Sequence, residues 1–264
     1  MSGFSPEWLA IREAWDHRSR SNEILAQLSH WLCRHQEAQG ATAKILDLGC
    51  GTGSTWRYLA RRLPDTHTWT LVDGDPGLLR IAAASTRGTT IAADLSTEPL
   101  EPIIGAHNLV TASALLDLVS EPWLDQLWHA VKTRRAGLLA SLTYDGRMAI
   151  SPSVSFDAVI KDLTNRHQVG EKGFGPALGP RATAALAARA RDAGWRVMVR
   201  RSDWELSPDE DRVGLAVLID GWAAAAREIE PGLCEQIEDW RANRLTSATR
   251  ITAGHRDLLA LPPD

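Results

Sequence analysis

Short apolar runs alternate with amphipathic stretches through the first half of the chain. Five runs have the length and aliphatic content of buried parallel strands, and they are residues 44–48, 68–73, 89–93, 108–113 and 137–144. Apolar positions at helical spacing lie between them, over residues 54–63, 76–86 and 121–133. Strands alternating with helices predict βαβ units. The expected fold is therefore α/β, with a Rossmann-like, seven-stranded, mostly parallel sheet and helices on both faces.

The flanking segments have other patterns. Residues 6–36 are apolar at helical spacing and predict N-terminal helices that end before Gly40. Residues 145–180 are rich in Gly, Pro and polar types and predict a long loop, which in a compact domain usually has a function. The remaining predicted elements are a helix over 181–193, a sixth strand over 195–205, helices over 208–228 and 233–245, and a seventh strand over 250–261 at the sheet edge.

The amino-acid composition limits the kinds of partner that this protein is expected to bind. The 29 basic and 33 acidic residues give a net charge of −4 and no basic run exceeds a pair, which argues against a nucleic-acid partner. No apolar stretch approaches the ~18 residues of a membrane span, and the first residues lack the layout of a signal peptide. Three isolated cysteines predict neither disulfides nor a metal site, so we expect a cytoplasmic protein without a metal.

Tryptophan is unusually frequent, with eleven against three Phe and two Tyr. Large aromatic side chains mostly pack in cores, and that is the first interpretation. The alternative is that one or two of them line a substrate pocket that accepts an apolar or cationic group.

The strongest chemical signal follows the first predicted strand. The run Asp47-Leu48-Gly49-Cys50-Gly51-Thr52-Gly53-Ser54 has glycines at alternate positions before a helix. Glycine permits a tight turn and lets backbone lie against a ligand without an intervening Cβ. The spacing differs from the Gly-x-Gly-x-x-Gly of dinucleotide-binding proteins.

This loop resembles that of the class I S-adenosylmethionine (SAM)-dependent methyltransferases. In that family an acid that closes the second strand binds both ribose hydroxyls, and Asp73 has this place; Asp75, before Pro76, fits a helix cap better. An acid after the third strand lies near the adenine amino group, and Asp94 matches it. The fourth strand, residues 109–116, resembles the segment that passes beneath the cofactor. These matches span about residues 44–145 in the expected order.

The resemblance implies SAM as cofactor and S-adenosylhomocysteine (SAH) as product. Related enzymes often fold an N-terminal helix over the cofactor and bind the methionyl carboxylate with a basic residue, for which Arg20 is our first choice because a guanidinium is bidentate. A solvated helix face is the alternative. The implied cofactor-binding residues are Arg20, Asp47, Gly49, Cys50, Gly51, Gly53, Ser54, Asp73, Gly74, Asp94, Leu95, Ser113 and Leu115.

The methyl acceptor is expected beyond the carboxyl ends of the fourth and fifth strands, where ligands bind in such sheets. His167 is the first candidate for a general base, since its ordinary pKa lies near neutrality, and Tyr144 is the second catalytic candidate. His255, with Asp257 nearby, is the alternative base. Surface or packing roles remain open for each. The predicted substrate-contacting residues are Asp117, Tyr144, Arg147, Asn165, His167, Gln168, Phe174 and His255.

The expected organisation is one methyltransferase domain over residues 1–264. Residues 1–40 would form a helical cap, 41–145 the SAM-binding core, 145–180 a substrate loop and 207–246 a helical insertion before the last strand. The monomeric and homodimeric states remain open.

The expected reaction is in-line displacement, in which an O, N or S atom takes the methyl group and the protein mainly aligns the reactants. The fourth strand is not followed by Asn-Pro-Pro-Tyr or Asp-Pro-Pro-Tyr, which by analogy argues against methylation of DNA bases or protein glutamine and favours a small biosynthetic metabolite. Three alternatives stay open: a nicotinamide oxidoreductase, a non-catalytic methyltransferase-like binding protein, and an aminopropyl transferase, for which Asp117 alone gives little support.

Overall fold

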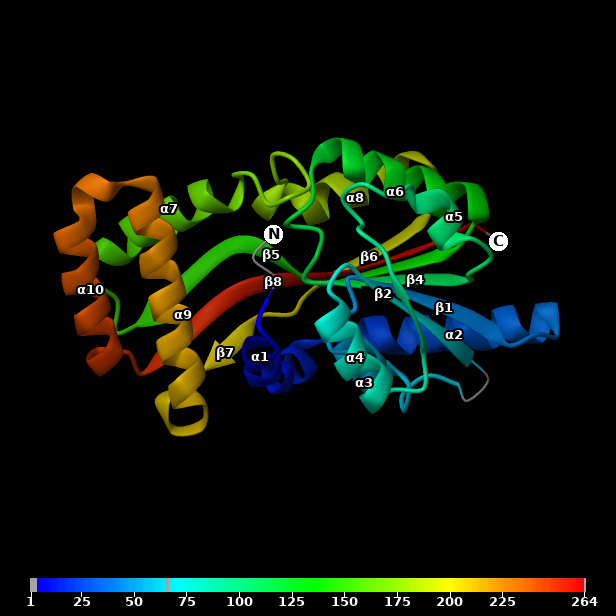
Figure 1. Cartoon of the computed structure of the whole chain (residues 1–264), viewed down its shortest axis with the longest axis horizontal. Helices are drawn as coiled ribbons and strands as arrows, with labels where there is room; N and C mark the ends of the chain where they lie inside the picture. The colour runs from blue at the N-terminus through cyan, green and yellow to red at the C-terminus, as the bar shows by residue number, and fades with distance from the viewer. Residues whose placement is uncertain (1–3, 65–66, 264) are drawn as a thin grey trace.

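One eight-stranded sheet forms the centre of the computed structural model, which describes residues 4–64 and 67–263 (Figure 1). The strand order is β3-β2-β1-β4-β5-β8-β6, and β7 pairs with β8 outside this path. The strands are β1 (Ala43–Leu48), β2 (His67–Asp73), β3 (Thr89–Ala92), β4 (Leu109–Ser113), β5 (Gly137–Ser151), β6 (Arg196–Arg201), β7 (Trp204–Leu206) and β8 (Arg250–Leu261). Strands β1 to β5 pair in parallel, whereas β8 is antiparallel to β5, β6 and β7. The carboxyl ends of β1 to β5 therefore meet at one edge.

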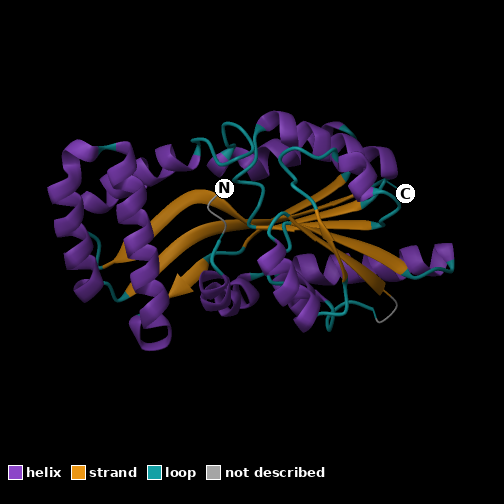
Figure 2. Cartoon of the chain, in the orientation of Figure 1, coloured by secondary structure: helices purple, strands orange, loops and turns teal. Residues whose placement is uncertain are grey.

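Helices cover both faces of the sheet (Figure 2). The helices are α1 (Pro6–Ser19), α2 (Asn22–Gln39), α3 (Ser54–Leu59), α4 (Pro76–Ser85), α5 (Leu100–Ile104), α6 (Glu121–Arg134), α7 (Phe156–Gln168), α8 (Ala182–Asp192), α9 (Pro208–Ile229) and α10 (Cys234–Ser247). One apolar core joins the sheet to α5, α6 and α8, and another joins it to α2, α3 and α4. None of the described helices is long and apolar enough to span a membrane.

A third apolar core lies where β5 and β8 extend beyond their neighbours. There α1, α7, α9 and α10 pack on these strand extensions and on β7, at the left of Figure 1. Several of the tryptophans lie in this core, among them Trp15, Trp204, Trp222 and Trp240. Packing therefore accounts for these residues, as the first interpretation proposed.

The predicted α/β, Rossmann-like fold is confirmed, but three elements differ from the prediction. The segment predicted as the sixth strand is divided into β6 and β7 at Ser202 and Asp203, so the sheet has eight strands rather than seven. The last strand is not at the edge, because β8 lies between β5 and β6. The predicted loop over 145–180 contains the end of β5 and the whole of α7.

Two of these differences have a tertiary cause. Most of β8 is buried, which suits a strand with neighbours on both sides. Residues 148–151 extend β5 because they pair with residues 250–253 of β8, a partner about 100 positions away. Local composition cannot show a pairing of this kind, since strand preference depends on the neighbours that a strand meets.

A charge network fixes the strand extensions to one another. Arg147 Nη1 donates to Asp203 Oδ2 at 2.9 Å, and Arg147 Nε donates to Asp145 Oδ2 at 2.7 Å. Arg256 Nε donates to the same Asp145 oxygen at 2.8 Å. A Cβ at Gly254 would lie 2.2 Å from Asp145 Oδ1, so only glycine permits this approach.

Helix α1 is attached to two different parts of the molecule. Its Trp15 ring packs against Gly214 of α9, and Trp15 Nε1 donates to Asp211 Oδ1 at 2.6 Å. On the other side, Leu9 lies over Gly51, and Glu13 forms an ion pair with Arg57 of α3 at 2.5 Å. The helix therefore links the glycine loop to α9.

Candidate functional site

The glycine loop joins β1 to α3 at the carboxyl edge of the sheet. Gly49, Gly51 and Gly53 have φ of +64°, +54° and +87°, the left-handed region in which residues with a Cβ are strained. A Cβ at Gly53 would also lie 2.7 Å from the Thr86 side chain. The alternate glycines thus fold the loop into a tight turn, as the sequence predicted, with its backbone close to α1 and to Leu115.

Asp73 holds the loop from the end of β2. Its Oδ2 accepts from the Gly51 amide at 2.8 Å, and its Oδ1 accepts from the Asp75 amide at 2.9 Å. Asp75 caps α4 by accepting from the Gly77 amide at 2.6 Å, as its place before proline predicted. Asp94 follows β3, next to Ala93, whose amide donates to the Asp73 carbonyl at 3.1 Å. The two acids that the resemblance singles out therefore end neighbouring strands.

Arg20 and Asp47 are buried side chains of opposite charge with unused hydrogen-bonding atoms. Arg20 Nη2 donates to Ser113 Oγ at 3.0 Å, but its Nε and Nη1 have no partner. Asp47 Oδ1 accepts from Thr111 Oγ1 at 2.6 Å, whereas Oδ2 has no partner. Buried ionic groups are normally fully paired. The two residues therefore provide free donors and a free acceptor at the carboxyl edge.

Burial raises the pKa of Asp47 to about 7, although Thr111 and Arg20 act in the opposite direction. The folded protein thus retains a proton on this carboxyl between pH ~4 and ~7 that the unfolded chain releases. Stability contributed by the protonated form is present below pH ~4 and is lost as the pH rises to ~7. We expect Asp47→Asn to make urea-unfolding stability less dependent on pH in this window, and to stabilise the protein at pH 8 relative to wild type. The same pH dependence in Asp47→Asn and in the wild-type protein would contradict the raised pKa of Asp47.

The predicted acceptor residues divide into two groups. Asp117, Tyr144, Asn165 and His255 form the first. Tyr144 Oη donates to Asn165 Oδ1 at 2.9 Å, and the Tyr144 and His255 rings, on paired positions of β5 and β8, have centroids 6.1 Å apart. Burial raises the pKa of Asp117 to about 6, with the Tyr144 backbone as one of its hydrogen-bonding partners, and Asp117 Oδ1 has no partner.

The second group consists of Arg147, His167, Gln168 and Phe174, which contact residues outside the first group. His167 Nε2 lies 3.0 Å from Glu228 Oε2 of α9, and its ring nitrogens also contact Lys172. Gln168 ends α7, with its carbonyl against Gly179. Phe174 packs edge-on against Trp123 at 5.6 Å. The ion pairs of Arg147 with Asp145 and Asp203 place it in the charge network.

Several polar residues of this region were not predicted. Arg12 of α1 is buried, bonds to Asp16 at 3.0 Å and lies 4.9 Å from the Trp204 ring centroid. Trp204 Nε1 in turn donates to Asp16 at 3.0 Å. Arg12 and Trp204 are about 190 positions apart, and no local pattern indicated their contact. Thr111 was inside an apolar strand, where a hydroxyl was the only available signal.

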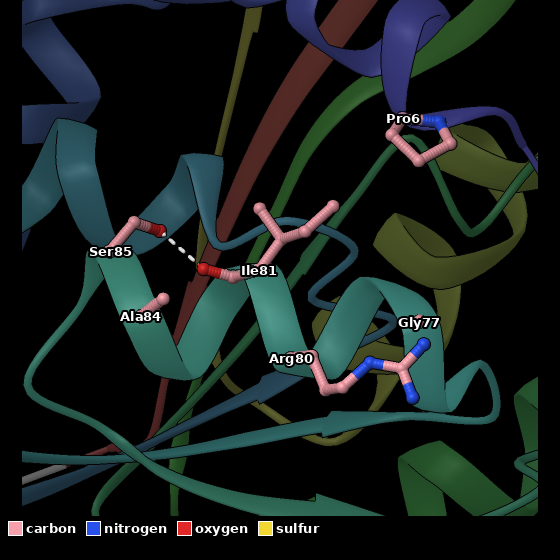
Figure 3. Close-up of a pocket in the computed structure, with 6 residues that line it drawn as sticks. All are labelled: Pro6, Gly77, Arg80, Ile81, Ala84 and Ser85. Atoms are coloured by element: carbon pink, nitrogen blue, oxygen red, sulfur yellow. Dashed lines mark hydrogen bonds between the residues drawn. The ribbon is translucent and has the colours of Figure 1, made fainter.

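A hollow of about 550 Å³ lies elsewhere, on the outer face of α4 (Figure 3). Its lining residues are Pro6, Gly77, Arg80, Ile81, Ala84 and Ser85. None of these was predicted as a site residue, and the hollow is open and largely apolar. We do not assign the chemistry to it.

Comparisons with known proteins agree with this geometry. Residues 45–134 match the family described as "Methyltransferase domain". This match contains the glycine loop, Asp73, Asp94 and the whole of β4. A search of curated proteins gives no match.

One solved structure with a TM-score above 0.5 shares the fold. The chain is similar to a cyclopropane-fatty-acyl-phospholipid synthase-like protein from Lactobacillus casei ATCC 334, at 15% identity and a TM-score of 0.52, over 95% of this chain and 99% of that one. YjhP from E. coli aligns at 14% identity and a TM-score of 0.45, over 97% of this chain and 99% of that one. Magnesium protoporphyrin IX methyltransferase from Synechocystis PCC 6803, a structure with bound SAH, aligns at 15% identity and a TM-score of 0.46, over 76% of this chain and 83% of that one. Residues 45–134 thus match a methyltransferase-domain family and lie in a Rossmann-like, mostly parallel sheet.

Proposed function

We propose that the chain is a SAM-dependent methyltransferase that transfers a methyl group to an O, N or S atom of a small-molecule acceptor. The observation that carries the proposal is the unsatisfied pair of Arg20 and Asp47 beside the glycine loop. An amino-acid end group has a carboxylate and an ammonium, which match the free guanidinium donors and the free carboxylate oxygen. The methionyl part of SAM has both.

The other cofactor contacts would come from the same edge. The Asp73 carboxylate, with each oxygen already accepting one backbone N–H, retains lone pairs for two ribose hydroxyls. Asp94, exposed after β3, is available to an adenine amino group. In this proposal residues 41–145 bind the cofactor, residues 1–40 cover it, and 145–180 with 207–246 form the acceptor side.

The bound cofactor supplies an activated methyl group on a sulfonium. The chain then has to hold the acceptor in line and exclude water. Helix α1 covers the loop through Leu9, which would lie 3.2 Å from a Cβ at Gly51, and His17 Nε2 contacts Ser54 Oγ at 3.1 Å. Arg20 and Asp47 orient the amino-acid end, so the reacting carbon faces the residues that follow β4 and β5.

The first experiment is thermal denaturation of the protein with SAM, SAH and NAD in parallel, each at about 100 times a micromolar Kd. A ligand at that excess stabilises the folded state by about 2.7 kcal/mol. We expect a higher Tm with the two adenosyl ligands and no change with NAD. The opposite pattern would favour the oxidoreductase alternative.

Two isosteric variants make this experiment specific. Asp73→Asn should remove most of the shift, because an amide has one acceptor oxygen where the carboxylate has two. Asp75→Asn is the matched control, since asparagine caps a helix as well as aspartate does, and it should keep the full shift. Equal shifts in both variants would remove Asp73 from the cofactor site.

A further inference from the structure

Asp257 of β8 is a buried carboxylate that binds two segments far apart in the sequence. Only 2% of the residue is exposed. Its Oδ1 accepts from the backbone amide of Leu142 in β5 at 2.9 Å, and its Oδ2 accepts from the amide of Ser21, between α1 and α2, at 3.0 Å. A bond from a backbone N–H to a carboxylate is stronger than one between neutral groups. Asp257 therefore fixes the backbone of both segments.

The first segment is an irregularity in β5. Two residues of this strand, Ser141 and Leu142, oppose the single residue Asp257 of β8, which is a β-bulge. Leu142 has a φ of +53°, a left-handed conformation that is strained for a residue with a Cβ. Such strain persists only where the surrounding structure compensates for it. The bond from the Leu142 amide to Asp257 is one such compensation.

The bulge determines the place of the residues that end β4. The Ser141 carbonyl accepts from the Ala114 amide at 2.9 Å, and Ala114 also has a left-handed φ, of +50°. Ser113, directly before Ala114, accepts from Arg20 Nη2 at 3.0 Å. The bonds that start at Asp257 and pass through the bulge therefore lead to the hydroxyl that holds the Arg20 guanidinium.

The second segment contains Arg20 itself. Ser21, whose amide binds Asp257, is the next residue after Arg20. Both residues line a cavity of about 10 Å³, together with Ser141 and Asp257. A cavity of this size holds no more than a water molecule, so the four residues lie close around one point. Asp257 thus fixes the backbone next to Arg20 on one side and the partner of its guanidinium on the other.

We propose that Asp257 is a positioning residue for cofactor binding, which holds Arg20 where its guanidinium binds the carboxylate of an amino-acid end group. This inference rests on the proposed function and goes beyond it, because it assigns a role to a residue that acts only through Arg20. The role requires a carboxylate. Both groups that Asp257 binds are N–H donors, and an asparagine side chain has only one acceptor oxygen.

A purely structural role for Asp257 predicts a different result. If Asp257 only held the sheet together, its loss would weaken the binding of every ligand of the site alike. If it acts through Arg20, only ligands with a carboxylate lose affinity. 5′-Methylthioadenosine separates the two roles, since it has the adenosine and the sulfur atom of SAH but lacks the amino-acid end group.

The first test removes only the amide from which Asp257 accepts. Ser21 has a φ of −72° and Arg20 before it has a ψ of +143°, so a proline fits this backbone, and Ser21→Pro deletes the N–H. Ser21→Ala is the matched control, because it keeps the N–H and loses the same side-chain cap of α2. In calorimetry, Ser21→Pro should raise the Kd for SAH by about 10-fold or more relative to Ser21→Ala. The Kd for 5′-methylthioadenosine should be equal in the two variants.

Asp257→Asn supplies an independent test. It should raise the Kd for SAH by a similar factor in the wild-type background and leave it unchanged in the Arg20→Leu background, because non-additive effects are expected of residues that act through one another. If Asp257→Asn does not fold, the two Ser21 variants decide alone.

Three outcomes would overturn the inference. They are equal losses of affinity for SAH and 5′-methylthioadenosine, equal affinities of Ser21→Pro and Ser21→Ala for SAH, and additive effects of Asp257→Asn and Arg20→Leu. Failure of SAH to bind the wild-type protein would instead overturn the proposed function, and the inference with it.

Discussion

Arg20→Leu is expected to weaken SAM binding by about 3 kcal/mol, which is roughly 100-fold in Kd. Arg20 has two unpartnered donors, Nε and Nη1, and only 6% of the side chain is exposed. Truncating one partner of a buried, hydrogen-bonded charge pair costs about 2–5 kcal/mol, since the other charge is left unpaired. Isothermal titration calorimetry with SAM and SAH measures the loss.

The same substitution should not destabilise the unliganded protein. Among the ion pairs of residues 4–64 and 67–263, none involves Arg20; its guanidinium is buried with two unpartnered donors, and Asp47, whose charged form it favours, has a pKa raised by burial. Replacing such a buried charge with an apolar side chain is neutral or stabilising by about 1 kcal/mol or more. A urea titration of Arg20→Leu should therefore show an unchanged or higher free energy of unfolding.

Arg62→Leu is the matched control. Arg62 also lies over the Tyr58 ring, at 4.3 Å against 5.0 Å for Arg20, but it is exposed. Its removal should leave the affinity for SAM as it is. If Arg20→Leu binds SAM as wild type does, or if both variants lose affinity equally, the carboxylate-binding role of Arg20 is wrong.

Gly214→Ala is expected to lower the free energy of unfolding by at least about 3 kcal/mol, the upper end of the usual cost of overpacking. A Cβ at this position would lie 1.7 Å from Trp15 Cζ2. The indole cannot easily move away, because its Nε1 is bonded to Asp211 and its ring packs edge-on against Trp8 and Trp204 at 5.9 and 5.5 Å.

Gly221→Ala, in the same helix, is the control, and it is expected to raise the free energy of unfolding. Nothing lies within 4 Å of a Cβ at Gly221, and alanine in an exposed helix interior stabilises by about 1 kcal/mol relative to glycine. Urea unfolding of the two variants should therefore move in opposite directions. A stabilised Gly214→Ala would show that α1 does not pack on α9 as described.

Local patterns were sufficient for much of the fold and for the loop. Residues 45–48 are apolar and buried in a parallel strand, and three left-handed turns follow at the predicted glycines. The Asp75-Pro76 pair predicted the start of α4. These features depend on a few neighbouring residues, so the sequence contains the information directly.

Long-range contacts decided the rest. His167 and His255 have the same ordinary pKa, so the sequence could not show that His255 is buried and His167 is not, because burial depends on neighbours from distant parts of the chain. Arg147 is bonded to Asp203, 56 positions away, and no local pattern indicated this contact.

The sequence by itself determined the alternation of strands and helices, the glycine turn and the acids near the ends of β1, β2 and β3, because backbone preference and periodicity act over short distances. Only the tertiary structure decided that β8 lies inside the sheet and that α1 joins the glycine loop to α9. It also decided that Arg20 and Asp47, beside the glycine loop, are buried with hydrogen-bonding atoms that have no partner. Burial, pairing and unmet hydrogen bonds are properties of residues brought together from distant parts of the chain, so they exist only once the chain has folded.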